Sequence, residues 1–163
     1  EHLWGYYCCG QITSSNRFLA YPSGRNRMLG AMLFKYNIEG FLQWGFNFYN
    51  SHLSLETVDP YATSTAGGWV PGGDPYVVYP GKDGNALPSL RLEVFREALQ
   101  DLRALEALAE KMQKSSVNPR EAVVIALGLE ELRFDKFNAD HTYLIRLREK
   151  INRMLAGENY DGL

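Results

Sequence analysis

The feature that most constrains the fold is the order of three segments in the first fifty residues. The segment LWGYYCCG (3–10) is rich in aromatic residues and ends at a glycine, which is typical of a buried strand. The segment 25–37 carries apolar residues at helical spacing, namely Met28, Leu29, Met32, Leu33 and Tyr36. The segment 38–49, IEGFLQWGFNFY, returns to a strand pattern. This order predicts a βαβ unit with two parallel strands and a right-handed crossover.

A long loop follows the second strand. Residues 50–88 are dense in glycine, proline, serine and aspartate, yet they keep several aromatic residues, among them Trp69. Loops of this length inside a domain are often functional. A disordered linker is the alternative, although linkers seldom carry so many aromatic rings.

The remainder of the chain has helical patterns. Ser89 is typical of a helix N-cap, Asn118 followed by Pro119 marks a second start, and Gly157 marks a stop. We therefore predict helices over 89–114, 118–132 and 140–155. The fold class is α/β, with residues 1–88 as a βαβ unit carrying an aromatic Gly/Pro loop and residues 89–163 as C-terminal helices.

Composition and net charge limit the kinds of partner that the protein is expected to bind. The net charge of −2 does not suggest a surface for nucleic acid or for an anionic membrane, and no apolar run reaches the length of about 20 residues that spans a bilayer. The histidines lie far apart and give no metal-binding spacing, so we expect neither a metal nor a cofactor. The only cysteines, Cys8 and Cys9, are adjacent, and a bridge between neighbours on a strand would be strained. We expect free thiols, which fit a reducing compartment but do not fix the localisation.

The end of the second strand concentrates aromatic rings beside amides. Ligands of parallel α/β proteins bind at the carboxyl ends of the strands. Sugar rings present flat C–H faces that pack on aromatic faces, while their hydroxyl groups need amide and carboxylate partners. Trp44 beside Gln43 and Asn47 supplies both kinds of contact. The alternative is that Trp44 belongs to the core, because tryptophans on strands usually pack inward.

The acidic residues of the first half give no obvious catalytic pair. Glycoside cleavage usually needs two carboxylates. We expect Asp59 and Asp74, each followed by proline, to cap turns rather than to transfer protons. The pair at 130–131 is expected on the solvated surface of a helix. Arg91 begins a helix directly after the loop, where it could pair with Asp74 and hold the loop over the site; the alternative is an ordinary solvated first turn.

Several segments, taken in order, resemble one bacterial family. LWGYYCCG, RMLGAMLFKYNIEGFLQWGFN, DPY, GGDPYVVYPG and PSLRLEVFREALQDLRALEAL follow the order seen in the family named domain of unknown function 4091, which is related to the catalytic domain of glycoside hydrolase family 123. The resemblance covers about residues 3–110. It implies the C-terminal part of a (β/α)8 TIM-like barrel, with 3–10 and 39–48 as its last two strands, followed by a helical segment.

The resemblance also implies a sugar site. Family 123 enzymes remove N-acetylgalactosamine from glycans, using the acetamido group of the substrate as nucleophile with the help of an adjacent Asp–Glu pair. By position, the residues at the strand ends match the family pattern. The later GD, YP and RLE motifs also match it, through Asp74, Tyr79, Arg91 and Glu93. With a glycan or other small carbohydrate as the expected ligand, the candidate substrate-binding residues are Trp4, Tyr6, Trp44, Asn47, Trp69, Asp74 and Arg91.

The chain departs from that family in ways that keep its activity open. The Asp–Glu pair belongs to an earlier strand and is absent here, so no catalytic residue is assigned within this chain. Pro75 replaces the usual glycine after the aspartate of the GD motif, and the run after RLE lacks a glycine and a glutamate. Three hypotheses follow: the C-terminal part of a glycoside hydrolase, a non-catalytic carbohydrate-binding module, or a structural domain with an aromatic core. Two strands with open edges predict either further chain or self-association.

Overall fold

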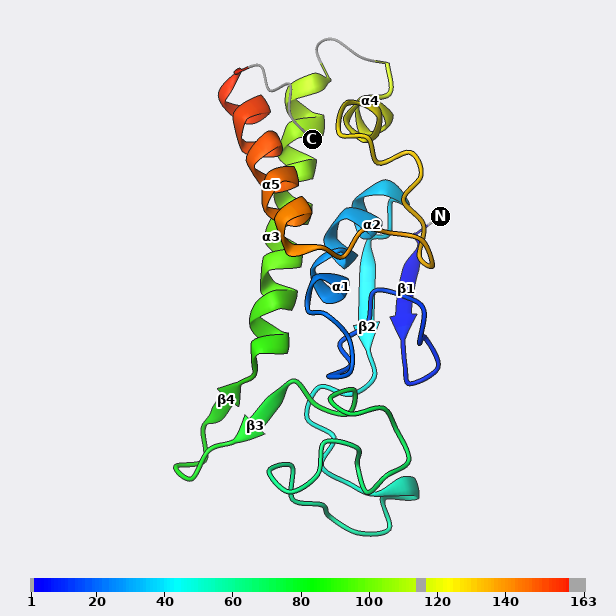
Figure 1. The fold of residues 1–163 in the computed structure, drawn as a ribbon, viewed down its shortest axis with the longest axis vertical. Helices are drawn as coiled ribbons and strands as arrows, with labels where there is room; N and C mark the ends of the chain where they lie inside the picture. The colour runs from blue at the N-terminus through cyan, green and yellow to red at the C-terminus, as the bar shows by residue number, and fades with distance from the viewer. Residues whose placement is uncertain (1, 114–116, 159–163) are drawn as a thin grey trace.

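The computed structural model describes residues 2–113 and 117–158, in which a parallel strand pair lies beside a long helix (Figure 1). β1 (Trp4–Tyr7) and β2 (Gly40–Gln43) are parallel, with Trp4 opposite Gly40 and Tyr7 opposite Gln43. The helices α1 (Gly24–Arg27) and α2 (Leu29–Lys35) connect them. The predicted βαβ order with parallel strands is confirmed, although the expected single helix is divided in two.

Both strands are shorter than predicted because β1 turns away after Tyr7. The Cys8 amide donates a hydrogen bond to the side-chain oxygen of Gln11 (2.6 Å), which ends the ladder along β2. The chain after β2 finds another partner in the long loop. The Phe48 amide donates to the carbonyl of Pro75 (3.0 Å), and the Val77 amide donates to the carbonyl of Phe46 (2.8 Å). The segment 75–77 therefore lies antiparallel to 46–48.

The loop region, residues 46–88, contains regular structure that the sequence analysis missed. A 3₁₀ turn, η1, spans His52–Ser54, and β3 (Val78–Pro80) pairs antiparallel with β4 (Ala86–Pro88). The connection between these strands contains Gly84 at φ +83°, a left-handed conformation that glycine adopts without strain. The disordered-linker alternative is therefore wrong for this region.

The helices begin directly after the predicted first positions 89, 118 and 140. α3 (Leu90–Met112), α4 (Pro119–Ala126) and α5 (His141–Ala156) follow the caps Ser89, Asn118 and Asp140, whose side chains each accept a hydrogen bond from a first-turn amide. Gly157, at φ 85°, ends α5 as predicted. The predicted end of the first of these helices, at residue 114, lies outside the described residues. No helix in the described ranges combines the length and apolarity needed to cross a bilayer.

One predicted helix end is wrong. The helix expected over 118–132 stops at Ala126, because Gly128 adopts φ +68° and the Leu129 amide donates to the carbonyl of Val124 (2.9 Å), as in a Schellman motif. Glu130 and Glu131 therefore lie in a turn rather than on a helix.

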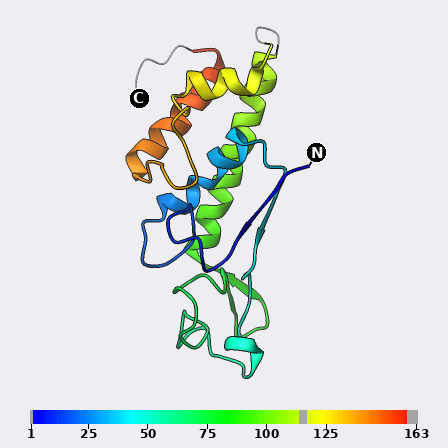
Figure 2. The same cartoon turned by 90° about the vertical axis from the view of Figure 1, so that its right-hand side faces the viewer.

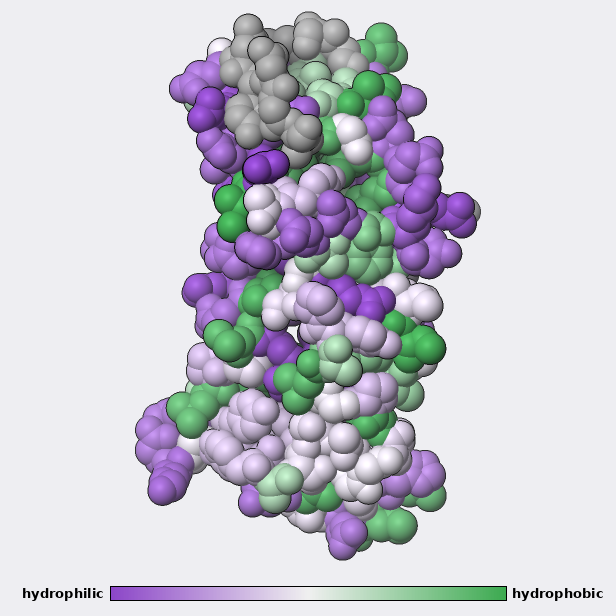
Figure 3. All heavy atoms as spheres, in the orientation of Figure 1, coloured by the Kyte–Doolittle hydropathy of each residue, from purple (hydrophilic) through white to green (hydrophobic). Residues whose placement is uncertain are grey.

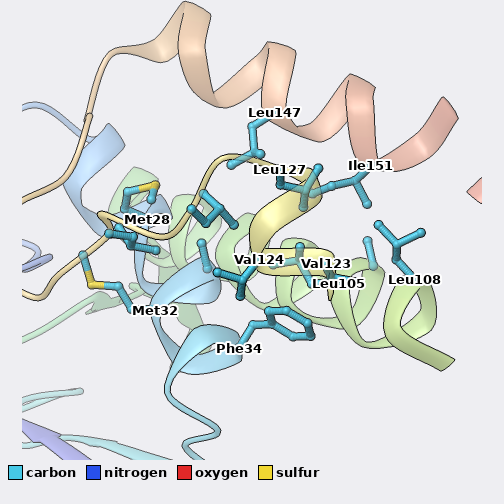
Figure 4. Packing of buried hydrophobic residues seen from close by; sticks show 14 of the residues in the cluster. Met28, Met32, Phe34, Leu105, Leu108, Val123, Val124, Leu127, Leu147 and Ile151 are labelled. Carbon is cyan, nitrogen blue, oxygen red and sulfur yellow. The ribbon is translucent and has the colours of Figure 1, made fainter. Parts of the chain in front are cut away.

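The main core lies where α2, α4 and α5 meet α3 (Figure 4). Its large buried members include Phe34, Leu105, Leu108, Val123 and Ile151. A smaller cluster of Tyr7, Leu29 and Leu33 joins α2 to the strand pair. Gly30 permits the close contact of α2 with α3, since a Cβ there would lie 1.9 Å from the carbonyl oxygen of Ala98. The helices thus cover one face of the strands.

The opposite face of the strand pair is uncovered within the described residues. Figure 2 shows the helices on one side of the strands and no chain against the other. Trp4, Tyr6 and Leu42 are 71%, 52% and 55% exposed, and alternation along the strands places them together on this face. Parallel sheets are normally covered on both faces, so this apolar surface has the character of an interface.

Asp101 joins three helices through charged contacts. Its buried carboxylate accepts hydrogen bonds from Arg27 of α1 and from Arg148 of α5, both at 2.8 Å. We expect Asp101→Ala to lower the free energy of unfolding by about 2 kcal/mol, because the charge-assisted bonds disappear while both guanidinium groups still reach water. Urea denaturation measures the loss. In the control Glu97→Ala, the lost pair is long (3.9 Å) and the glutamate side chain is 43% exposed, so a change within about 0.5 kcal/mol is expected. Equal losses in the two variants would contradict this role.

Candidate functional site

The carboxyl ends of β1 and β2 point toward the loop region, and Asp74 is the centre of the contacts there (Figure 1). Its side chain is buried, with the residue 2% exposed. One carboxylate oxygen, Oδ2, accepts a hydrogen bond from Nε1 of Trp44 (2.5 Å). The other, Oδ1, accepts one from Nε2 of Gln43 (3.0 Å). The loop carboxylate therefore fixes two consecutive side chains at the end of β2.

Arg17 extends this network on its inner side. Its Nη1 donates to Oε1 of Gln43 (2.6 Å), and its guanidinium carbon lies 4.4 Å from the ring centroid of Phe95. The residue is 3% exposed. Because the Gln43 amide accepts from Arg17 and donates to Asp74, its orientation is determined from both sides. We call the series Arg17, Gln43, Asp74 and Trp44 the polar relay.

Burial shifts the pKa values of both charged residues in the polar relay, Asp74 and Arg17. It raises the pKa of Asp74, against the hydrogen bonds from Trp44 and Gln43 and the charge of Arg17. It also lowers the pKa of Arg17 to about 10, against the attraction of Asp74. Arg17 is thus still a cation at neutral pH, and its charge reaches Asp74 across the Gln43 amide.

The raised pKa of Asp74 predicts a pH effect of defined sign. The folded state holds the Asp74 proton more tightly than the unfolded chain, so this contribution to stability is present below the unfolded pKa and is lost as the pH rises through the folded pKa. We expect the unfolding free energy of the protein, minus that of Asp74→Asn, to increase when the pH is lowered from 7 to 4. Chemical denaturation of both proteins at the two pH values measures the difference. A difference that stays constant or decreases would contradict the assignment.

Trp44 lies close to other aromatic rings. Its ring centroid lies 5.2 Å from that of Phe48 and 5.7 Å from that of Trp69, whose ring is in turn 5.1 Å from His52. Trp44 is half-buried, and Trp69 is 38% exposed. The tryptophan pair therefore keeps an open side rather than lying wholly within the core.

Gly45 allows the loop to approach the strand end. A Cβ at this position would lie 2.6 Å from the carbonyl oxygen of Asp74 and 2.6 Å from Cα of Pro75. These are backbone atoms and cannot move aside independently. The absence of a side chain at Gly45 thus permits the contact between Asp74 and Trp44.

A separate cleft lies within the loop region. It has a volume of about 530 Å³ and is lined by Pro60, Tyr61, Ala62, Thr63, Ser64, Tyr79 and Leu87. The rings of Tyr61 and Tyr79 lie 5.3 Å apart. The cleft does not include Trp44, so the aromatic rings of the loop region form two groups.

The structure brings together some of the predicted site residues and separates others. Trp44, Trp69 and Asp74 lie in one group of contacts, and Asn47 is exposed on the segment that pairs with 75–77. Tyr6 lies on the uncovered sheet face, opposite Leu42. Trp4 pairs with Gly40, which precedes Trp44 by four positions. Along the strand direction, Trp4 and Trp44 are therefore separated by roughly 13 Å.

Arg91 does not form the expected pair with Asp74. Its Nη2 donates to the carbonyl of Tyr76 (2.8 Å), while the Asn26 side chain donates to the carbonyl of Arg91 (2.7 Å). Asp74 instead faces Trp44 and Gln43, and it does not act as the predicted turn cap. The Arg91 side chain therefore holds the loop by binding a main-chain carbonyl of the loop. The turn-cap prediction is confirmed for Asp59, which accepts from the Tyr61 amide (2.9 Å).

Sequence reasoning missed Arg17, Phe48 and His52 as members of the site. Arg17 lies in the segment 11–24, whose polar and turn-forming residues are typical of a loop, yet residues 15–18 are all buried. No periodicity in the sequence signals that burial. The aromatic density around Phe48 was a usable signal for its place beside Trp44.

The cysteines and acidic groups complete the chemical description. Cys8 and Cys9 are free, as predicted, with their sulfur atoms 3.6 Å apart. In the described part of the chain, no group of three or more histidine, cysteine, aspartate or glutamate residues could hold a metal ion. The groups around Trp44 are an oriented indole, other aromatic rings and side-chain amides. Groups of these kinds can bind a ligand.

The chain matches a known protein family. The family model described as "Glycoside hydrolase 123, catalytic domain" matches residues 1–108. This range includes both parallel strands, the loop region and all members of the polar relay. No curated protein matches the chain.

Proposed function

The chain belongs to the glycoside hydrolase 123 catalytic domain family, and on this premise we propose that it forms the sugar-binding end of a glycoside hydrolase-like domain. The ligand is a glycan with an N-acetylhexosamine residue, and cleavage is assisted by the substrate's own acetamido group. In this proposal residues 1–88 form the end of a TIM-like barrel, with the helices of 89–163 packed on it.

The hydrogen bond between Trp44 and Asp74 is the observation that carries the proposal. An indole whose N–H is held by a buried carboxylate keeps one orientation, so its ring can serve as a fixed platform for the C–H face of a sugar. Trp69 extends the platform, and the exposed Asn47 offers an amide to hydroxyl groups. In Figure 3 the loop region, at the lower end of the view, is mostly pale, as expected for a surface of tyrosine, glycine, serine and threonine.

Asp74 acts in this proposal as a positioning residue. Both of its oxygens accept hydrogen bonds and the residue is buried, so it cannot approach a glycosidic oxygen without breaking those bonds. Arg91 has a similar supporting role, because it holds the loop at the carbonyl of Tyr76. The proton-transfer groups are assigned to another part of the domain, since cleavage usually requires a suitably placed acid.

The uncovered sheet face supports the barrel part of the proposal. Trp4, Tyr6 and Leu42 form an exposed apolar surface on a parallel strand pair, and both edges of such a pair need neighbours. We infer that further barrel strands cover it in the whole domain. If they are missing, self-association is expected, and light scattering of the isolated chain distinguishes an associated form from a monomer.

A non-catalytic carbohydrate-binding domain is the second candidate, because the platform requires no carboxylate pair. Release of nitrophenol from a nitrophenyl N-acetyl-β-galactosaminide by the whole protein separates the two. Binding without release would favour the second candidate.

The proposal is tested by titrating the whole protein with N-acetylgalactosamine while tryptophan fluorescence is recorded. We expect a saturable change, because the sugar would pack on the rings of Trp44 and Trp69. Glucose, which lacks the acetamido group, should produce a much weaker effect. If neither N-acetylgalactosamine nor N-acetylglucosamine changes the fluorescence, the sugar-binding role is wrong.

A further inference from the structure

Three buried polar atoms without hydrogen-bond partners belong to residues that line one small cavity. The atoms are Nη2 of Arg17, Nε of Arg91 and Oδ1 of Asn26. The cavity has a volume of about 70 Å³ and lies between the segment 16–23 and the first turn of α3. Figure 3 shows a hollow bordered by hydrophilic residues at the level where, in Figure 1, the chain before α1 passes the beginning of α3. Unpaired buried polar atoms are rare in native proteins, so their gathering here indicates that water or an ion occupies the cavity.

The charges around the cavity are unbalanced. Its lining contains two guanidinium groups and no carboxylate; the other lining residues are Asn16, Phe18, Leu19, Tyr21, Pro22, Ser23 and Asn26. Among the described residues, neither Arg17 nor Arg91 forms an ion pair within 4.0 Å. Asp74 acts on Arg17 only across the Gln43 amide. Two positive charges therefore face one negative charge.

We propose that this cavity binds one small monovalent anion of the size of chloride, which accepts hydrogen bonds from Nη2 of Arg17 and Nε of Arg91. A water molecule occupies about 10–15 Å³ of such a volume, so the cavity has room for the anion and for water. A water beside the anion would donate to Oδ1 of Asn26. Water alone would satisfy the three atoms but would leave the buried charge of Arg17 without a direct counter-charge, which is costly.

The anion would lie at the inner end of the polar relay. Its charge would offset the charge that Arg17 presents to Gln43 and Asp74, and its hydrogen bonds would hold the Arg17 guanidinium against Phe95. The site is therefore coupled to the orientation of Trp44 without contacting it. This inference depends on the contacts of Arg17 and Arg91 and does not require the proposed sugar chemistry.

Thermal unfolding of the chain in sodium chloride and in sodium gluconate, at equal ionic strength, tests the proposal. Because a ligand that binds only the folded state stabilises it, we expect the midpoint to be higher by about 3 °C in chloride and to saturate with chloride concentration. Arg91→Gln should abolish the difference. The matched control Arg96→Gln, on the same helix but in an exposed pair with Glu93, should keep it. Equal midpoints for the unmodified chain in the two salts would overturn the proposal.

Crystals grown in sodium bromide provide a second measurement that does not depend on the folding of a variant. We expect one anomalous peak in contact with both Arg17 and Arg91. A cavity that contains water and no anomalous peak would also overturn the proposal.

Discussion

Asp74→Ala is expected to lower the free energy of unfolding by about 4 kcal/mol. The substitution removes two hydrogen bonds to a charged acceptor and leaves the donors of Trp44 and Gln43 unpaired near the protein interior. It also removes the negative charge that offsets Arg17, which is 3% exposed and cannot recover its hydration without a structural change. The expected cost exceeds that of Asp101→Ala, because the arginines that pair with Asp101 remain in contact with water.

Urea denaturation with a matched aspartate control measures this effect. Asp59 also precedes a proline in the loop region, but it is exposed and only caps a turn, so Asp59→Ala should cost about 1 kcal/mol or less. The double variant Arg17→Met/Asp74→Ala removes both charges. Its loss of unfolding free energy should be smaller than the sum of the losses of Arg17→Met and Asp74→Ala. Simple additivity would show that Arg17 and Asp74 are not coupled through Gln43.

The features that the sequence predicted well are those decided by neighbouring residues. The caps Ser89, Asn118 and Asp140 accept hydrogen bonds from amides three positions ahead, and Gly157 ends its helix through its own backbone conformation. Local rules also explain the early end of α4, since Gly128 adopts the left-handed conformation typical of a helix stop, whereas the sequence analysis extended this helix to 132.

The features that the sequence could not predict depend on contacts between distant segments. β3 and β4 each contain a proline and have little apolar alternation, so only their pairing reveals them as strands. The sequence suggests Arg91 as the partner of Asp74, because it begins a helix directly after the loop. The nearby charge is Arg17, and a glutamine on β2 transmits the contact. Nothing in a single sequence connects those three positions.

Because these residues come from distant segments of the chain, the candidate site depends on contacts between those segments. The ring that faces solvent, Trp44, comes from a strand, whereas the carboxylate that orients it comes from the loop and the charge behind that carboxylate comes from the segment before α1. The loop region must therefore be folded against the strand ends before the platform exists. Gly45 permits that contact, because any side chain there would collide with the backbone at Asp74 and Pro75.

Trp44→Ala is expected to weaken the binding of N-acetylgalactosamine to the whole protein by about tenfold or more. The substitution removes the ring on which the sugar would pack, and aromatic residues at binding sites commonly contribute well over 1 kcal/mol. Some stability is also lost, since Asp74 loses the indole donor. Trp44→Phe retains a ring but lacks the N–H that fixes its orientation, so it should give an intermediate loss of affinity.

Isothermal titration calorimetry measures these affinities without relying on tryptophan fluorescence. Asp101→Ala is the matched control, because it should destabilise the fold by a comparable amount while lying among the helices, away from the strand ends. Its affinity for the sugar should stay within about twofold of the unmodified protein, since the ligand-contacting rings are untouched. If Trp44→Ala and Asp101→Ala lose affinity in proportion to their loss of stability, the indole serves the fold alone. A large affinity loss confined to the Trp44 variants would show that its exposed face is where the sugar binds.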